Sequence, residues 1–112
     1  MSAQALKGHL DGMLLAALED GPRHGYAVME VLRAGSGGRF DLPTGTVYPA
    51  LRRLERAGHV RARWSEEGGR RRRVYELTAN GRRALSDERH AWQEFSAAVT
   101  TLLGPHRRPA TP

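Results

Sequence analysis

The spacing of apolar residues along this chain changes at His59 and changes back after Thr78. Before His59, apolar residues recur at steps of three and four, which is the period of a helix with one buried face. Between His59 and Leu77 they recur at steps of two, which is the period of a strand. The pattern therefore predicts three helices, a β-hairpin and a last, long helix, in that order.

Two helices are predicted in the first third of the chain. One covers residues 10–19 and stops at a Gly-Pro pair, because glycine and proline end helices. The other covers about residues 25–34 and stops at the glycine-rich segment that begins at Gly35. We expect Tyr26 to lie in the core beside these helices.

A third helix is predicted over about residues 44–57. We expect Thr44 or Asp41 to cap its free amides, and Pro49 to lie near its first turn, where a missing N–H costs least. Its core face holds Val47, Leu51 and Leu54. Its opposite face is polar and holds Thr44, Thr46, Tyr48, Arg52, Arg53 and Arg56.

A β-hairpin and a long fourth helix complete the predicted elements. The apolar residues of the hairpin are Val60, Ala62, Trp64, Tyr75 and Leu77. Its loop, Glu66 to Arg71, is polar and has two glycines for the reversal. Thr78 is placed to cap the fourth helix, over residues 79–103. Residues 104–112 form a tail containing proline and arginine, which we expect to be disordered.

The chain carries an excess of positive charge. It has 18 Lys and Arg residues against 12 Asp and Glu residues, a formal net charge of +6. The arginines concentrate on the third helix and the hairpin: Arg52, Arg53, Arg56, Arg61, Arg63, Arg70, Arg71, Arg72 and Arg73. So many like charges in one stretch repel one another unless a polyanion neutralises them. The pattern therefore predicts a polyanionic partner.

The order of the elements is that of a winged helix-turn-helix fold, in which the third helix enters the major groove of DNA. Arginines on the hairpin can then reach the flanking phosphates. We predict DNA contacts from Thr44, Thr46, Tyr48, Arg52, Arg53, Arg70, Arg71 and Arg72. Arg73 is the least certain of the hairpin arginines, because strand alternation prevents all four from facing one way. For Tyr48, a half-buried position with its hydroxyl in water is an equal alternative.

The fourth helix is longer than so small a domain can cover, and it carries an apolar seam. The seam consists of Leu85, Trp92, Phe95, Val99 and Leu102, the last four at steps of three, four and three. We predict that it pairs with a second copy, which would set two reading helices about 34 Å apart on one face of DNA. Packing of the seam on the chain's own core is the alternative. Trp92 is also a candidate for stacking on a planar ligand, with core packing as the alternative.

Several kinds of chemistry lack their residues in this chain. The absence of cysteine excludes thiol catalysis and thiolate metal sites. No two histidines have the spacing of metal ligands, and no nucleotide-binding or hydrolase motif is present, so we expect no metal, no cofactor and no enzymatic activity. No apolar stretch is long enough to cross a bilayer and the first residues do not form a signal peptide, so we expect a cytoplasmic protein without a membrane partner.

Four segments share the order and spacing of one known family: residues 14–18, 21–26, 45–58 and 73–81. The most specific parts are Gly-Thr-Val-Tyr-Pro-Ala-Leu at 45–51 and Tyr-Glu-Leu-Thr-Ala-Asn-Gly at 75–81. Over roughly residues 6–103 the chain resembles the PadR-like transcriptional regulators, in the shorter subfamily with a single C-terminal helix.

The resemblance implies a winged-helix dimer that binds operator DNA, commonly as a repressor that a small molecule relieves. It implies a recognition helix over 44–53, a wing at 70–73 and a dimer helix over 92–102. Some members of the family bind planar aromatic or drug-like compounds between the paired terminal helices, and Trp92 occupies the matching place.

The predicted fold is mainly α with a β-hairpin wing. A winged helix-turn-helix domain over 1–78 is followed by a C-terminal dimerisation helix over 79–103 and a tail over 104–112. The predicted function is that of a sequence-specific transcriptional regulator, a ligand-responsive repressor that binds double-stranded operator DNA as a homodimer. The alternative is a winged-helix interaction module whose basic face docks an acidic protein or RNA.

Overall fold

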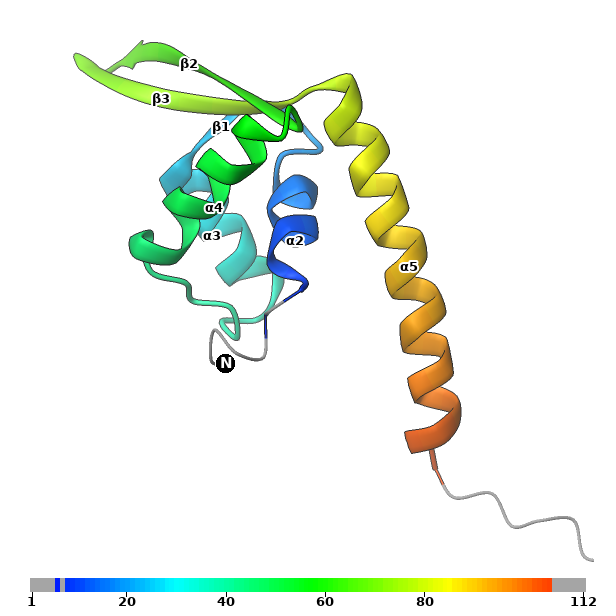
Figure 1. Ribbon diagram of the computed structural model, residues 1–112. Helices are drawn as coiled ribbons and strands as arrows, with labels where there is room; N and C mark the ends of the chain where they lie inside the picture. Colours follow the sequence, from blue (N-terminus) through cyan, green and yellow to red (C-terminus); the bar gives the residue numbers. More distant parts are fainter. Residues whose placement is uncertain (1–5, 7, 106–112) are drawn as a thin grey trace, which may run out of the picture.

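The order of elements in the structure is the predicted one, with one strand added (Figure 1). The computed structural model describes residue 6 and residues 8–105 of the chain, so most of the predicted tail lies outside the described residues. The elements are α2 (Leu10–Ala17), β1 (Arg23–His24), α3 (Gly25–Gly35), α4 (Thr44–Arg56), β2 (Val60–Glu67), β3 (Arg70–Leu77) and α5 (Ala79–Leu103).

The added strand is β1, the two residues immediately before α3. It pairs antiparallel with β3, Arg23 opposite Tyr75 and His24 opposite Val74, and makes the hairpin a three-stranded sheet of order β1-β3-β2. Two residues are too few to show an alternating pattern, which is why the sequence did not indicate this strand. The pairing fixes the base of the hairpin to the segment between α2 and α3.

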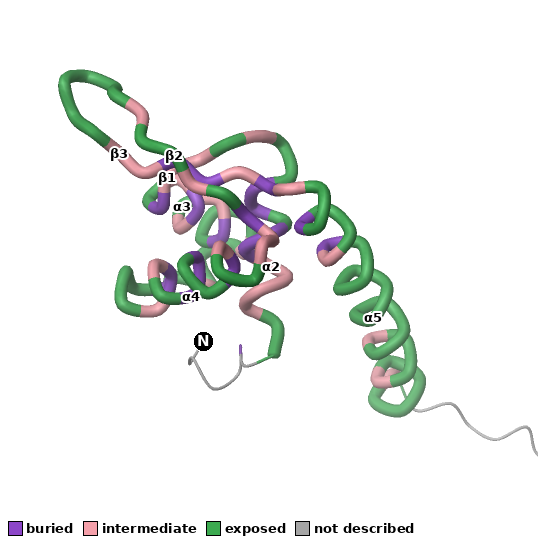
Figure 2. Tube along the Cα trace, turned by 45° about the horizontal axis from the view of Figure 1, so that its top comes forward, coloured by how far each residue is buried: buried purple, intermediate pink, exposed green. Residues whose placement is uncertain are grey.

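The core lies between α2, α3, α4 and the inner face of the sheet (Figure 2). Its most completely buried side chains are Leu14, Leu15, Leu18, Val28, Val47, Leu51, Val60 and Tyr75. The core face predicted for the third helix is confirmed, since Val47, Leu51 and Leu54 are all buried. The prediction for Tyr26 is wrong, because its side chain is 64% exposed on α3.

The hairpin is longer and its turn tighter than predicted. The strands pair from Val60 opposite Leu77 to Glu67 opposite Arg70, so only Gly68 and Gly69 form the turn. Both glycines have positive φ, 58° and 78°, as tight two-residue hairpin turns require. The arginines that were expected in a loop therefore lie on a strand, and their side chains alternate between its two faces.

The helix ends follow the prediction at α5 and depart from it at α4. The Thr78 hydroxyl accepts a hydrogen bond from the Gly81 amide at 3.0 Å and donates to the Gly58 carbonyl at 2.6 Å, which confirms the cap. At α4 the N-cap is Pro43 and no side chain caps the amides. Pro49 lies inside α4, beyond its first turn, where it cannot donate to the carbonyl of Gly45.

The last helix, α5, packs against the rest of the domain from its start to about Trp92, whose ring meets His9. Leu85 is 5% exposed and belongs to the core of its own chain, so its predicted place in an intermolecular seam is corrected. Farther along, Trp92, Phe95 and Leu102 are 52%, 57% and 83% exposed. In Figure 1 the C-terminal half of α5 extends past the other helices. None of the helices in the described part of the chain combines the length and apolarity needed to span a bilayer.

Candidate nucleic-acid interface

The exposed face of α4 borders two adjoining hollows that share Arg52 and Arg56. One, of about 440 Å³, is lined by Thr44, Gly45, Tyr48, Pro49, Arg52 and Arg56. The other, of about 400 Å³, is lined by Arg52, Glu55, Arg56, Trp64 and Arg73. Together they form a surface, here called the α4 groove, that runs from the start of the helix to the hairpin.

Helical spacing explains which side chains of α4 line the groove. Residues 44, 48, 52 and 56 follow one another at steps of four, so their side chains lie along one face. Arg53 lies about 100° farther round the helix, and its guanidinium forms an ion pair with Asp11 on α2. Thr46 is half-buried and lines neither hollow. Of the residues predicted on this helix, the groove therefore includes Thr44, Tyr48 and Arg52 but not Thr46 or Arg53.

Tyr48 is a partly buried residue at the edge of the groove, and its contact with DNA stays a prediction. It is half-buried, and its ring covers Gly25 at the start of α3, where an added Cβ would lie 2.5 Å from the ring. The residue also lines the groove beside Thr44. The ring thus joins α4 to α3 beneath the surface that the groove presents.

The hairpin arginines divide between two faces of β3. Arg71 and Arg73 share a face with Trp64, and their guanidinium carbons lie 4.7 and 5.5 Å from the centroid of the indole. The Arg73 guanidinium also forms an ion pair with Glu55 of α4 at 3.0 Å. This face of the hairpin is therefore joined to α4, whereas Arg70 is exposed on the other face.

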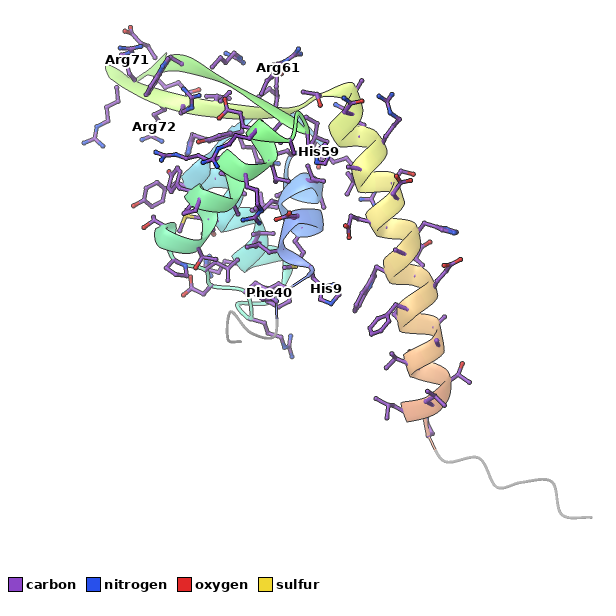
Figure 3. The ribbon with its side chains drawn as sticks, viewed as in Figure 1. His9, Phe40, His59, Arg61, Arg71 and Arg72 are labelled. Carbon is purple, nitrogen blue, oxygen red and sulfur yellow. The ribbon has the colours of Figure 1, made fainter. Side chains whose placement is uncertain are left out.

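Arg72 lies on the same face of β3 as Arg70 and contacts β1. Its Nη1 lies 3.0 Å from Nε2 of His24, whose Nδ1 accepts from the Ala27 amide and caps α3. Figure 3 labels Arg71 and Arg72 near the free end of the hairpin and Arg61 nearer its base. The predicted set Arg70, Arg71 and Arg72 is thus not one surface.

Ion pairs and burial shift two pKa values around this sheet. Arg61 donates a hydrogen bond to Glu76 at 2.8 Å, which lowers the pKa of that carboxyl and keeps it charged. Burial raises the pKa of the Tyr75 phenol, so this core side chain stays neutral. Within the groove itself the charged residues are Arg52, Arg56, Arg73 and Glu55, and Glu55 offsets Arg73.

The predicted DNA contacts do not include Arg56, Trp64 or Glu55, although all three line the groove. Arg56 was recognised on the polar face of the helix but not selected, although it continues the four-residue spacing from Thr44. The sequence indicates Trp64 only as an apolar residue of the hairpin, without a role in the site, and it is 55% exposed because the hairpin extends beyond the helices. Glu55 reaches Arg73 across the groove, a contact between distant segments that no local pattern reveals.

A separate apolar hollow, of about 470 Å³, lies between α2 and α5. It is lined by Leu6, His9, Gly12, Met13, Ala16, Phe40, Leu85, Glu88, Arg89 and Trp92. The ring of Trp92 meets His9 edge to face at 5.1 Å and lies 5.9 Å from Phe95. Trp92 therefore belongs both to this hollow and to the exposed apolar stripe of α5, which also holds Phe95 and Leu102.

The helices, the sheet and the cationic groove define a winged helix-turn-helix protein with an added C-terminal helix. The model of the transcriptional regulator PadR-like family matches residues 14–87, and the chain belongs to this family. Its members are transcriptional regulators, not enzymes.

Relatives and solved structures agree with this assignment. A transcriptional regulator of Mycobacterium tuberculosis is 37% identical over 81 residues, which cover 71% of this chain and 72% of that protein. A PadR family transcription regulator of Clostridium difficile has a TM-score of 0.78 at 28% identity, covering 87% of this chain and all of the other. A PadR-like regulator of Bacillus cereus has a TM-score of 0.80 at 25% identity, covering 93% of this chain and all of the other.

Proposed function

We propose that this transcriptional regulator binds double-stranded operator DNA as a homodimer, with α4 in the major groove and the hairpin beside it. The observation that carries the proposal is the α4 groove. One edge of it is a helix face with Thr44, Tyr48 and Arg52, and the other is a strand face with Arg73. An exposed helix beside a cationic hairpin fits the width of a major groove and its flanking phosphates.

Base discrimination is assigned to Arg52 and Arg56. Both side chains are exposed in the groove, and arginine recognises the guanine edge with two hydrogen bonds, each such pair worth about 1–3 kcal/mol of discrimination. Thr44 and the Tyr48 hydroxyl are suited to backbone or base contacts near the start of α4. Arg71, which is exposed on the hairpin face that adjoins α4, adds affinity that does not depend on sequence.

Dimerisation is assigned to the exposed stripe of α5. Trp92, Phe95, Leu102 and the neighbouring Leu103, which is 81% exposed, present large apolar side chains along a helix that extends past the domain. A contiguous apolar surface of this kind indicates an interface. Pairing of two such helices would cover the stripe and present two α4 helices to successive major grooves, about 34 Å apart.

The hollow between α2 and α5 is the site that we assign to a small-molecule effector, and relief of repression is the proposed response. Its walls are chiefly apolar, and Trp92 and Phe40 offer flat faces to a planar aromatic compound. A ligand there would contact both the body of the domain and the helix that we assign to dimerisation.

The test is binding of the purified protein to a duplex from its own upstream region, against a shuffled duplex at matched salt. Tighter binding to the upstream fragment, with an affinity that falls steeply as salt rises, supports the proposal. Equal and weak binding to both duplexes, with tighter binding to RNA or to an acidic protein, would favour the interaction module instead. A reporter driven by the upstream region, with and without the protein, gives the sign of regulation.

A further inference from the structure

Trp64 is a large aromatic residue on the hairpin that the core does not use. Its side chain is 55% exposed, and it lines the α4 groove together with Arg52 and Arg56. Exposing an indole costs free energy that a smaller polar residue at this position would avoid. The contacts that it makes are with two guanidinium groups, Arg71 and Arg73.

The strand register fixes which arginines can reach the indole. Trp64 is directly opposite Arg73, and directly opposed residues of antiparallel strands project from the same face. Arg71 precedes Arg73 by two residues in β3 and so lies on that face too. Arg70 and Arg72 project from the other face, and Arg72 contacts His24 there. The indole therefore holds two of the four arginines on the side of the hairpin that faces α4.

The two arginines on the indole differ in their other partners. Arg73 is paired with Glu55 at 3.0 Å, with 38% of its side chain exposed, so its charge is offset within the protein. Arg71 is exposed and forms no ion pair with any described residue, although Glu66 is opposite it in the hairpin. Arg73 thus joins the hairpin to α4, while the charge of Arg71 is available to a ligand.

We propose that Trp64 is a positioning residue that holds Arg71 beside the α4 groove, where Arg71 contacts a DNA phosphate. The contacts from Glu55 to Arg73 and from Arg73 to Trp64 set the position of the hairpin relative to α4. Trp64 then holds the Arg71 side chain on the face beside α4. The inference rests on the proposed function, since it names the residue that delivers one phosphate contact of that site.

The experiment compares salt dependence of binding to the upstream duplex among single variants. Arg71→Ala is expected to reduce the slope of log affinity against log salt by about 0.9, the value for one lost phosphate contact. Arg70→Ala removes the same charge from the other face and is the matched control, expected to change the slope by much less. Trp64→Ala is expected to weaken binding about 3- to 30-fold, the range that a cation–π contact gives.

Two comparisons separate positioning from a general loss of structure. Trp64→Phe keeps an aromatic face and is expected to retain most of the affinity that Trp64→Ala loses. The double variant Trp64→Ala, Arg71→Ala is expected to bind no more weakly than Arg71→Ala alone. Both changes act on the same contact, that of Arg71 with a DNA phosphate. Fully additive losses, or an equal change of slope for Arg70→Ala and Arg71→Ala, would overturn the proposal.

A readout without DNA distinguishes failure of this inference from failure of the proposed function. In a Trp92→Phe background, Trp64 is the only tryptophan, and its fluorescence should change with Arg71→Ala but not with Arg70→Ala. If the wild-type protein binds no duplex while this difference is seen, the phosphate contact is overturned and the positioning by Trp64 stands. If the fluorescence does not distinguish the two variants, the positioning itself is overturned.

Discussion

The ring of Tyr48 lies against the backbone of Gly25, so closely that a Cβ at position 25 would be 2.5 Å from the ring. Gly25 is the first residue of α3, and Tyr48 is in α4. The contact sets how closely these two helices approach one another. It also explains in physical terms why a glycine precedes Tyr26 and why a tyrosine stands within the Gly-Thr-Val-Tyr-Pro segment.

Gly25→Ala is expected to destabilise the fold by about 1–3 kcal/mol, because the added methyl group overlaps an aromatic ring that is itself packed. Urea unfolding measures the change in the free energy of unfolding. Gly45→Ala is the control, since a Cβ at Gly45 meets nothing within 4 Å. In a Tyr48→Ala background the penalty of Gly25→Ala should shrink, and a penalty that stays the same would show that the ring is not its cause.

Arg52→Ala is expected to weaken binding to the upstream duplex by about 1–3 kcal/mol and to reduce discrimination against the shuffled one. Arg53→Ala is expected to have a smaller effect, because Arg53 is outside the α4 groove and is paired with Asp11. Fluorescence anisotropy at one salt concentration compares the two variants. A larger loss of affinity for Arg53→Ala would mean that the face of α4 that contacts DNA is the one toward α2.

Trp92→Ala combined with Phe95→Ala is expected to convert the protein to a monomer at micromolar concentration, since it removes two adjoining aromatic side chains from the stripe of α5. Sedimentation equilibrium gives the mass. His90→Gln alters the same helix without removing apolar surface and should leave the mass unchanged. If the double variant keeps the mass of the wild-type protein, the interface lies elsewhere.

The ion pair between Glu19 and Arg89 should make stability depend on pH at the acid end. Arg89 donates hydrogen bonds of 2.8 and 2.9 Å to the two carboxylate oxygens, and these lower the pKa of Glu19 below its ordinary value of 4.5. Because the folded-state pKa is the lower one, the pair stabilises the fold above pH 4.5 and the contribution is lost as pH falls through the folded value.

Glu19→Gln should therefore be less stable than the wild-type protein at neutral pH, by the small amount typical of exposed pairs, and equal to it well below pH 4.5. Urea unfolding of both proteins across this range measures the difference. Glu94→Gln, which alters an exposed glutamate farther along α5, is the comparison. A difference between wild type and Glu19→Gln that is the same at every pH would mean that the pair does not couple to protonation.

Local patterns were sufficient to predict the fold and insufficient to predict the faces of the site. The period of the apolar residues located every long element, and it gave the bounds of α5 to the residue because Thr78 and Gly104 mark its ends. The groove face of α4 required knowledge of what lies on each side of the helix. Arg52 and Arg53 both belong to the polar face that the sequence predicts, and the ion pair with Asp11 on α2 shows that Arg53 lies on the side of α4 away from the groove.

The hairpin and α5 show the same limit. Trp64 fits the alternation of a buried strand face, but that face continues past the end of the core, where it meets arginines instead of apolar side chains. Leu85 and Trp92 belong to one apolar stripe in the sequence. The body of the domain covers Leu85, whereas about half of Trp92 stays exposed. How far the core extends along a helix or strand is set by the elements that pack against it. The residue pattern of that helix or strand does not contain this information.

The pairing of Arg23 with Tyr75 has a consequence for synthesis on the ribosome. The segment between α2 and α3 cannot complete its hydrogen bonds until a strand some fifty positions later has been translated and has emerged. A nascent polypeptide ending after α4 therefore holds three helices with their sheet-facing apolar side chains uncovered. Closure of the native structure must wait for β3, and a truncation before Tyr75 should give an aggregation-prone product in place of a smaller domain.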